Sequence, residues 1–481
     1  MVAQRDSGST DKLAAQIARH IEADVVRRGW PVGESLGSEQ ALQRRYGVSR
    51  SVLREAVRLV EHHQVARMRR GPGGGLLICE PDAGPATRAV VIYLEYVGTT
   101  LVDLLNARLV LEPLAASLAA ERIDEVGIDR LRAVLRAEQH WRPGQPAPRD
   151  EFHIALAEQS KSPVLQLFID ILIRLTTRYA LASRTDSETE AIEAVDHMHK
   201  HHAEIVAAVT AGDAARARSL SERHVEAVTA WLQRHHPGGK GRPRARRRRL
   251  DGDAPRAKLA EMLAATIGDE IVDGGWQPGS VFGTETALVE RYRVSRAVFR
   301  EAVRLLEYHS VAQMRRGPGG GLIVTRPQAE ASIETIALYL QYRKPTGDDL
   351  RSVRDAIEID NVARVVKRRT ESEVASFLEA HRSDPGSGAR EATEAMGDEV
   401  RFHLGLARLA GNALLDLFLR IIIELFRRHW SSTGQAQPTW EDVAAVEHAH
   451  VRILQAIKAG DDSLARYRIR RHLDAAASWW L

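Results

Sequence analysis

Residues 43–78 read QRRYGVSRSVLREAVRLVEHHQVARMRRGPGGGLLI, and residues 289–324 read VERYRVSRAVFREAVRLLEYHSVAQMRRGPGGGLIV. The two stretches align without a gap at an offset of 246, and 25 of their 36 positions are identical. Solenoid repeats are about 20–50 residues long, so this much longer period excludes a solenoid. It indicates instead that a complete multidomain unit was duplicated within one chain.

The surrounding sequence gives each copy the same order of expected elements. In the first copy, an amphipathic helix is expected over 13–28, a short helix over 38–46, and a third helix from Ser49 to about residue 62. Ser38 and Ser49 are suitable N-caps. Two short apolar runs around the GPGGG segment then predict a hairpin within 65–78. This order predicts a winged helix-turn-helix domain in each copy.

The third expected helix carries a stripe of positive charge. Arg50, Arg54 and Arg58 follow one another at intervals of four, so they share one helix face. A solvated surface is one interpretation of such a stripe, and contact with nucleic acid is the other. The glycine-rich wing beside the arginines, repeated in the second copy, favours DNA. A phosphate-binding loop is disfavoured because no Gly-Lys-Ser/Thr sequence follows the glycines.

The segment GVSRSVLREAVRLVEHHQVARMRRGPGGGLLI resembles the DNA-binding domain of the GntR superfamily, FadR subfamily. The motif VSR-x-x-x-RE-A followed by an R-G-x-G wing carries this resemblance. It implies that each copy contacts an operator through the start of the third helix and through the wing. The residues so implied are Ser49, Arg50, Ser51, Arg54, Arg70 and Gly71, and in the second copy Ser295, Arg296, Arg300, Arg316 and Gly317. Ala297 replaces Ser51, so the two half-sites are expected to differ.

The later part of each copy has helical periodicity throughout. Arg108 and Glu112 lie four residues apart near its start, and Arg354 and Glu358 repeat the pair. One interpretation is a surface ion pair, worth about 0.3–0.5 kcal/mol. The family resemblance implies the other, in which Arg108 and Arg354 bind a small effector, with a carboxylate as the favoured class.

Histidines recur at matched positions in both copies. The second copy has Glu399 and His403 four residues apart, then His450 and His472, and the first has Asp150, His153, His202 and His224. Imidazoles with one carboxylate suit Zn²⁺, Ni²⁺, Mn²⁺ or Fe²⁺, and the set resembles the Asp-x-x-x-His, His, His motif of the family's metal-containing FCD sensor domain. In the first copy Arg149 stands at the position of the acid, so the second copy is the better metal site. The neighbouring His197, His199 and His201 are either surface residues or competing candidates.

Composition bounds the remaining possibilities. Cys79 is the single cysteine, which excludes an internal disulfide and a cysteine-rich zinc site. The N-terminus lacks an apolar signal core, and no apolar run reaches the roughly 18 residues that a membrane helix needs. We therefore expect a cytoplasmic protein with no membrane partner.

These observations predict a mainly α protein with two winged helix-turn-helix domains and two all-α helical-bundle sensor domains. The expected boundaries are DNA-binding domains at 1–80 and 257–326, connectors at 81–99 and 327–345, sensor domains at 100–234 and 346–481, and a basic linker at 235–256. The favoured function is a non-enzymatic, operator-binding regulator, preferably a repressor, that acts as a single-chain pseudo-dimer. An architectural DNA-binding protein and a metal-dependent enzyme are the alternatives, and further association of two chains stays open.

Overall fold

The computed structural model describes the chain except for residues 1–6, 70, 72, 141–150, 183–187, 236–255, 316, 318, 381–391, 434–439 and 481. Asp150, Arg70 and Arg316, together with most of the expected basic linker, therefore lie outside the described residues. The described parts contain twenty helices and five short strands, which confirms the predicted mainly α fold. None of these helices combines the length and the apolar character that crossing a membrane requires.

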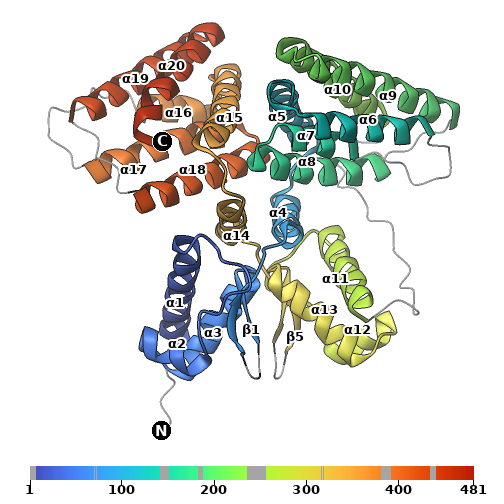
Figure 1. Ribbon diagram of the computed structural model, residues 1–481, viewed down its shortest axis with the longest axis vertical. Coiled ribbons are helices and arrows are strands. Elements are labelled where there is room, and N and C mark those ends of the chain that lie inside the picture. The colour runs from blue at the N-terminus through green and yellow to red at the C-terminus, as the bar shows by residue number, and fades with distance from the viewer. Residues whose placement is uncertain are drawn as a thin grey trace. The chain divides into compact units, whose positions relative to one another are not determined.

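The first of two compact units comprises residues 1–88 and 334–344. It contains a winged helix-turn-helix domain, which we call head one, built from α1 (Ser7–Arg27), α2 (Glu39–Tyr46), α3 (Arg50–His62), β1 (Ala66–Arg69) and β2 (Gly75–Ile78) (Figure 1). Helices α1 and α3 pack together over a core that includes Ile21, Leu53 and Val60. Leu13 lies on the same face of α1 as Ile17 and Ile21, but its side chain is 41% exposed.

Caps at the helix ends fix the helix-turn-helix. The Ser38 hydroxyl accepts a hydrogen bond from the amide of Ala41, and the Ser49 hydroxyl accepts one from the amide of Val52. Each bond satisfies an amide that the first helical turn leaves without a partner. Gly47 joins α2 to α3 with φ of 63°, in the left-handed region that glycine adopts without steric cost. Both predicted N-caps are therefore confirmed.

The wing is an antiparallel hairpin in which Ala66 lies opposite Ile78 and Arg69 lies opposite Gly75. Gly75 is needed there for space, because a Cβ at this position would lie 2.6 Å from the Ser35 hydroxyl oxygen and 2.7 Å from the Gly37 carbonyl oxygen. The loop at 35–37 can therefore pack directly against the hairpin backbone.

The second unit comprises residues 89–333 and 345–481 and contains the other winged helix-turn-helix domain, which we call head two. Its elements are α11 (Arg256–Asp273), β3 (Val281–Gly283), α12 (Glu285–Tyr292), α13 (Arg296–Tyr308), β4 (Ala312–Arg315) and β5 (Gly321–Val324). The strand order is β3-β5-β4, all antiparallel. Strand β3 was not expected from the sequence; in head one only an isolated bridge between Ser35 and Leu77 stands at that place.

The connector helices α4 (Ala83–Val97) and α14 (Ala329–Arg343) are exchanged between the copies. Leu338 of α14 belongs to the core of head one, and the Tyr342 ring lies 5.5 Å from that of Trp30. In the same way Tyr96 of α4 packs on head two, with its ring 5.4 Å from that of Trp276. Each head is therefore completed by the connector of the other repeat.

The second unit also holds two helical bundles, whose central helices α5 and α15 contact each other (Figure 1). Bundle one comprises α5 (Leu101–Arg122), α6 (Glu125–His140), α7 (Glu151–Gln159), α8 (Pro163–Ala182), α9 (Glu188–Thr210) and α10 (Ala214–His235). Bundle two comprises α15 (Gly347–Lys367), α16 (Ser372–Ala380), α17 (Ala392–Ala410), α18 (Ala413–Thr433), α19 (Trp440–Ala459) and α20 (Asp462–Trp480).

The contact between the bundles combines apolar and polar groups. Phe168 and Phe418 occupy matching places in the two copies, and their rings stack at a centroid distance of 3.9 Å. Arg122 of bundle one donates to Asp349 of bundle two at 2.8 Å. No equivalent ion pair is described between Arg368 and Asp103, because Arg368 pairs with Glu371 in its own bundle. The two halves of this interface are therefore chemically different.

Candidate nucleic-acid interface and metal centres

The first helical turn of α3 presents polar side chains at the surface of head one. Ser49 caps the helix, and its hydroxyl lies 3.0 Å from that of Ser51. The side chains of Arg50 and Arg54 are 64% and 59% exposed. The structure thus brings four of the residues implicated in DNA contact into one exposed helix terminus, the part of a recognition helix that reaches base edges in the major groove.

Glu39, the first residue of α2, holds both arginines. Its carboxylate accepts hydrogen bonds from Nε of Arg50 at 2.9 Å and from Nε of Arg54 at 3.0 Å. The hydrogen bond from Arg50 is the main reason that the pKa of Glu39 is lowered, and the bond from Arg54 adds to it. This arrangement fixes the direction of both guanidinium groups while leaving most of their donors available to an anion.

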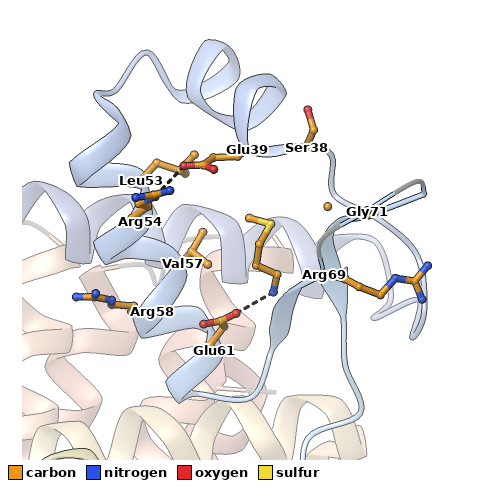
Figure 2. A pocket seen from close by; sticks show the side chains of 12 residues that line it. Ser38, Glu39, Leu53, Arg54, Val57, Arg58, Glu61, Arg69 and Gly71 are labelled. Atoms are coloured by element: carbon orange, nitrogen blue, oxygen red, sulfur yellow. Dashed lines mark hydrogen bonds and ion pairs between the residues drawn. The ribbon is translucent and has the colours of Figure 1, made fainter.

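A hollow of about 570 Å³ separates α3 from the wing, and Arg54, Arg58, Arg69 and Gly71 are among the residues that line it. Figure 2 shows Arg54 and Arg58 extending from α3 on one side and Arg69 from β1 on the other. Gly71, with φ of 99°, lies near the wing tip. The hollow is thus lined by arginines of two elements together with Glu39 and Glu61, and Arg58 and Arg69 join the predicted Arg54.

Head two repeats this geometry with three differences. Ser295 caps α13 and Arg300 is held by Glu285 at 3.0 Å, but among the described residues Arg296 makes no such bond. Ala297 replaces Ser51, so no hydroxyl pair forms there. Arg293 occupies the left-handed turn position of Gly47, with φ of 53°. Gly317, like Gly71, lies at the wing with positive φ.

In bundle two, all four residues of the predicted metal site converge. Glu399 and His403 lie four residues apart on α17, whereas His450 comes from α19 and His472 from α20, and one ligand atom of each lies within 4.8 Å of the others. The Glu399 carboxylate lies 3.0 Å from Nε2 of His403, 3.2 Å from Nε2 of His472 and 2.9 Å from Nε2 of His450. The sequence spacing thus becomes a buried cluster with its nitrogens facing inward.

Glu358, which was not predicted to join this cluster, contacts Nδ1 of His403 and is itself bonded to Arg354 at 2.6 Å. Burial by itself lowers the pKa of His403. The charges and hydrogen bonds of Glu358 and Glu399 have the larger effect and raise this pKa to about 9. The same ion pairing holds the pKa of Glu399 well below its ordinary value despite burial. A histidine supported by a carboxylate through Nδ1 is the usual setting of a metal ligand that binds through Nε2.

Bundle one gathers His153, His202 and His224 within the same 4.8 Å, all of them buried. Glu112 lies 3.1 Å from Nδ1 of His153. It occupies the place that Glu358 has beside Nδ1 of His403. Asp150, predicted as the fourth ligand, lies outside the described residues. The ring of His202 stacks on Phe152 at 3.7 Å, and His450 stacks on Phe402 at 3.7 Å, so the two clusters share their framework.

A further carboxylate, Glu138 of α6, supports His202 in bundle one. Its oxygens lie 2.9 and 3.1 Å from Nδ1 of His202, and burial raises its pKa to about 8. Nε2 of His202 and both ring nitrogens of His224 are buried and have no hydrogen-bond partner among the described residues. Burial keeps the pKa of both histidines well below the ordinary value, so their rings are neutral. Neutral buried imidazoles with free nitrogens fit a transition-metal ion.

Arg108 and Arg354 are not surface residues. Arg108 is 2% exposed and Arg354 5%, and each is held by the glutamate four residues later on its helix. The surface ion-pair interpretation is therefore wrong, because both pairs lie in the bundle interior. Nη2 of Arg354 lies 3.8 Å from Glu399. This proximity places a guanidinium at the edge of the histidine cluster.

Two protein-family models match the chain, and each of them matches it twice. Residues 13–75 and 259–321 match the family described as bacterial regulatory proteins, gntR family, and residues 103–227 and 349–475 match the FCD domain. Together these matches span more than half of the chain. The chain belongs to the GntR family. It is a transcriptional regulator with two GntR-type DNA-binding domains and two FCD domains, and this family is regulatory rather than enzymatic.

Other GntR-family proteins resemble roughly half of this chain. The HTH-type transcriptional regulator LutR of Bacillus subtilis (strain 168) is 29% identical over 214 residues, which are 42% of this chain and 92% of LutR. The Uxu operon regulator of Haemophilus influenzae is 26% identical over 232 residues, 46% of this chain and 82% of its own length. A Streptococcus agalactiae GntR structure covers 45% of this chain at 22% identity and a TM-score of 0.33.

Four candidate functional residues were not predicted from the sequence. Glu112 and Glu358 were noticed only as partners of arginines four residues earlier, although each also reaches a histidine from another helix. The counterpart of Glu138 falls within residues 381–391, outside the described part of the chain, and no motif marks Glu138 itself. Glu39 carries no distinctive motif. Such supporting carboxylates are found only when the tertiary contacts are known.

Proposed function

We propose that this regulator is a FadR-subfamily repressor whose two heads read the two halves of one operator and whose bundles sense a divalent metal and a small organic acid. The observation that carries the proposal is the pairing, in each copy, of a capped arginine-bearing helix with a buried three-histidine cluster. The relative named as the Uxu operon regulator supports an operator as the target. Such a role belongs in the cytoplasm.

Glu399, His403, His450 and His472 would hold the metal in bundle two, and His153, His202 and His224 would hold it in bundle one. Zn²⁺, Ni²⁺, Mn²⁺ and Fe²⁺ all accept imidazole and carboxylate ligands. When bound, the ion would offer an open coordination position to a carboxylate ligand. Glu399 gives bundle two the more complete ligand set among the described residues.

Arg354 and Arg108 would bind the acidic effector. The Arg354 guanidinium lies beside both Glu358 and Glu399, so a carboxylate entering there would find a cation already held in place. Arg108 is held by Glu112 and lies 3.5 Å from the hydroxyl of Thr176. A planar guanidinium matches a carboxylate in two-point geometry, which favours an acid over a neutral metabolite.

DNA footprinting tests the operator assignment. Arg50→Ala and Arg296→Ala should each weaken protection of a different half-site, by roughly 5- to 100-fold for loss of a bidentate base contact. Arg218→Ala, which removes an exposed arginine of α10, is the matched control and should leave both half-sites protected. Unchanged operator affinity in both head variants would refute the assignment.

Elemental analysis of purified protein tests the metal assignment. The double variant His403→Ala, His450→Ala should lose one equivalent of metal per chain relative to the wild type. His20→Ala, which removes an exposed histidine of α1, serves as the control and should lose none. Retention of the full metal content by the double variant would show that these residues do not form the centre.

A further inference from the structure

A groove on the surface of bundle two lies between α19 and α20. It has a volume of about 350 Å³ and is lined by residues that include Ala445, Ala449, Arg452, Tyr467, Arg468 and Arg471. The two alanines lie one helical turn apart on α19, and their small side chains leave room beside α20. The groove thus depends on the absence of bulk along one face of α19.

Bundle one has the same two helices with larger side chains on this face. The Ala-Gly-Asp turns at 211–213 and 459–461 align the copies, and they place His197 and His201 where Ala445 and Ala449 stand. The rings of His197 and His201 lie 4.4 Å apart, packed along the corresponding face of α9. The duplication therefore supplies an internal comparison in which this face carries two imidazole rings instead of two alanines.

The charges have diverged as well. In bundle one, Glu204 of α9 pairs with Arg223 of α10 across the helices at 3.5 Å. The matching residues of bundle two are Arg452 and Arg471, so an ion pair has become two like charges. Arg468 adds a third positive charge where bundle one has the apolar Leu220. A surface that merely needed stability would not gather like charges across a groove.

Within the described residues, no carboxylate pairs with Arg452, Arg468 or Arg471. The nearby acids of α20 are engaged elsewhere, because Asp462 pairs with Arg466 and Asp474 pairs with Arg351. Arg468 donates through Nη1 to the backbone carbonyl of Arg452, which holds its side chain at the groove, while its Nε is buried without a partner. Three cations with free donors thus face one concave surface.

We propose that this groove binds a small oxyanion carrying at least two carboxylate or phosphate groups. Guanidinium groups match both kinds of oxyanion in two-point geometry, and the volume falls within the roughly 300–1,000 Å³ of small-molecule sites. Tyr467, which is 58% exposed, offers an aromatic surface beside the charges. His472 also lines the groove and reaches Glu399 through Nε2, so an occupant would contact a helix of the metal cluster. This site goes beyond the proposed function and is confined to bundle two.

Calorimetric titration of the full chain, freed of metal by chelator and dialysis, tests the site. The probes are propane-1,2,3-tricarboxylate and fructose 1,6-bisphosphate at constant ionic strength, which separate a carboxylate from a phosphate ligand. We expect one molecule of at least one probe to bind per chain. Arg452→Glu should weaken that binding at least tenfold, because it restores with Arg471 the ion pair that bundle one has. This substitution follows a natural pairing in the same fold, so the variant should remain folded.

Arg470→Glu, which makes the same charge change on α20 outside the groove, should alter affinity less than twofold. Absence of binding by both probes would overturn the proposal, and so would equal losses in the two variants, which would indicate general charge attraction. If Arg452→Glu weakened only duplex DNA binding, the groove would be a DNA contact and the proposal would be wrong. Operator footprints and metal content are measured separately, so failure here leaves the proposed function intact.

Discussion

At the residue scale, the two copies differ most informatively where one side chain has been exchanged at an otherwise shared position. Arg293 takes the left-handed turn conformation that Gly47 adopts in head one. A non-glycine residue there costs roughly 1–2 kcal/mol. The arginine is exposed and lies two residues before the cap of α13. A contact with a DNA phosphate would offset the free-energy cost of this backbone conformation.

Arg293→Gly should therefore stabilise the protein by about 1 kcal/mol while weakening its binding to DNA. The log–log slope of affinity against salt should fall in magnitude by about 0.9, which is the value for one lost phosphate contact. Urea unfolding and anisotropy titrations at several salt concentrations measure the two effects. Gly47→Arg is the converse control and should destabilise head one. If the variant were stabilised but its salt slope were unchanged, Arg293 would not contact a DNA phosphate.

Glu138 gives a second prediction at this scale, concerning metal affinity in bundle one. A metal-bound His202 carries its proton on Nδ1, and Glu138 is placed to accept it. Glu138→Ala should weaken the metal affinity of the first centre by about 10- to 100-fold. Glu138→Gln keeps a carbonyl oxygen for that proton and should retain most of the affinity.

Competition with a chromogenic chelator measures both Glu138 variants, in a background where His403→Ala and His450→Ala have removed the second centre. Equal affinity in the alanine and glutamine variants would mean that Glu138 does not position His202. Near-ultraviolet circular dichroism, which should be the same in both, identifies any variant that has merely lost its packing.

At the element scale, the sequence predicted the helices of each head well because their signals are local. Ser38 and Ser49 act as caps where expected, and α3 ends at His62 as its pattern indicated. Strand β3 was missed because its three residues, Val281–Gly283, carry too little pattern and become a strand only by pairing with β5. The convergence of histidines was predictable from the repeat, whereas their supporting glutamates come from separate helices.

The exchange of connector helices had no sequence signal, because Leu338 and Ile92 are matched apolar residues and nothing in the sequence assigns either of them to one head. Leu338 is 2% exposed in the core of head one. Leu338→Ala should destabilise that head by about 2–4 kcal/mol, since large-to-small changes in a core cost about this much. Hydrogen exchange should accelerate in α1 and α3, which lie more than 200 residues away in sequence.

Ile92→Ala is the matched variant, because Ile92 packs against the core of head two. Its effect should appear in α11 and α13 while α1 and α3 keep their protection. If Leu338→Ala instead loosened α11 and α13, each connector would serve the head of its own repeat and the exchange would be refuted.

At the scale of the whole molecule, the duplication places two DNA-binding heads and two helical bundles in one chain. Arg122, Asp349 and the stacked Phe168 and Phe418 join the bundles within a single chain. A protease site placed between residues 240 and 250 should therefore yield two fragments that stay together. Light scattering should report a mass near 53.4 kDa before and after cleavage. Separation of the fragments would show that the linker alone holds the copies, and a doubled mass before cleavage would show that two chains associate.

The exchanged connectors also determine which head each bundle should control. Along the chain, α14 leads directly into α15, whose Arg354 and Glu358 border the second histidine cluster, yet the residues of α14 complete head one. Changes in bundle two should therefore act on head one, and changes in bundle one on head two. The variant His403→Ala, His450→Ala should abolish the metal response of the half-site that Arg50→Ala identifies, while the half-site identified by Arg296→Ala still responds. Footprinting with and without metal distinguishes this crossed arrangement from a direct one, in which the same variant would silence the half-site of head two.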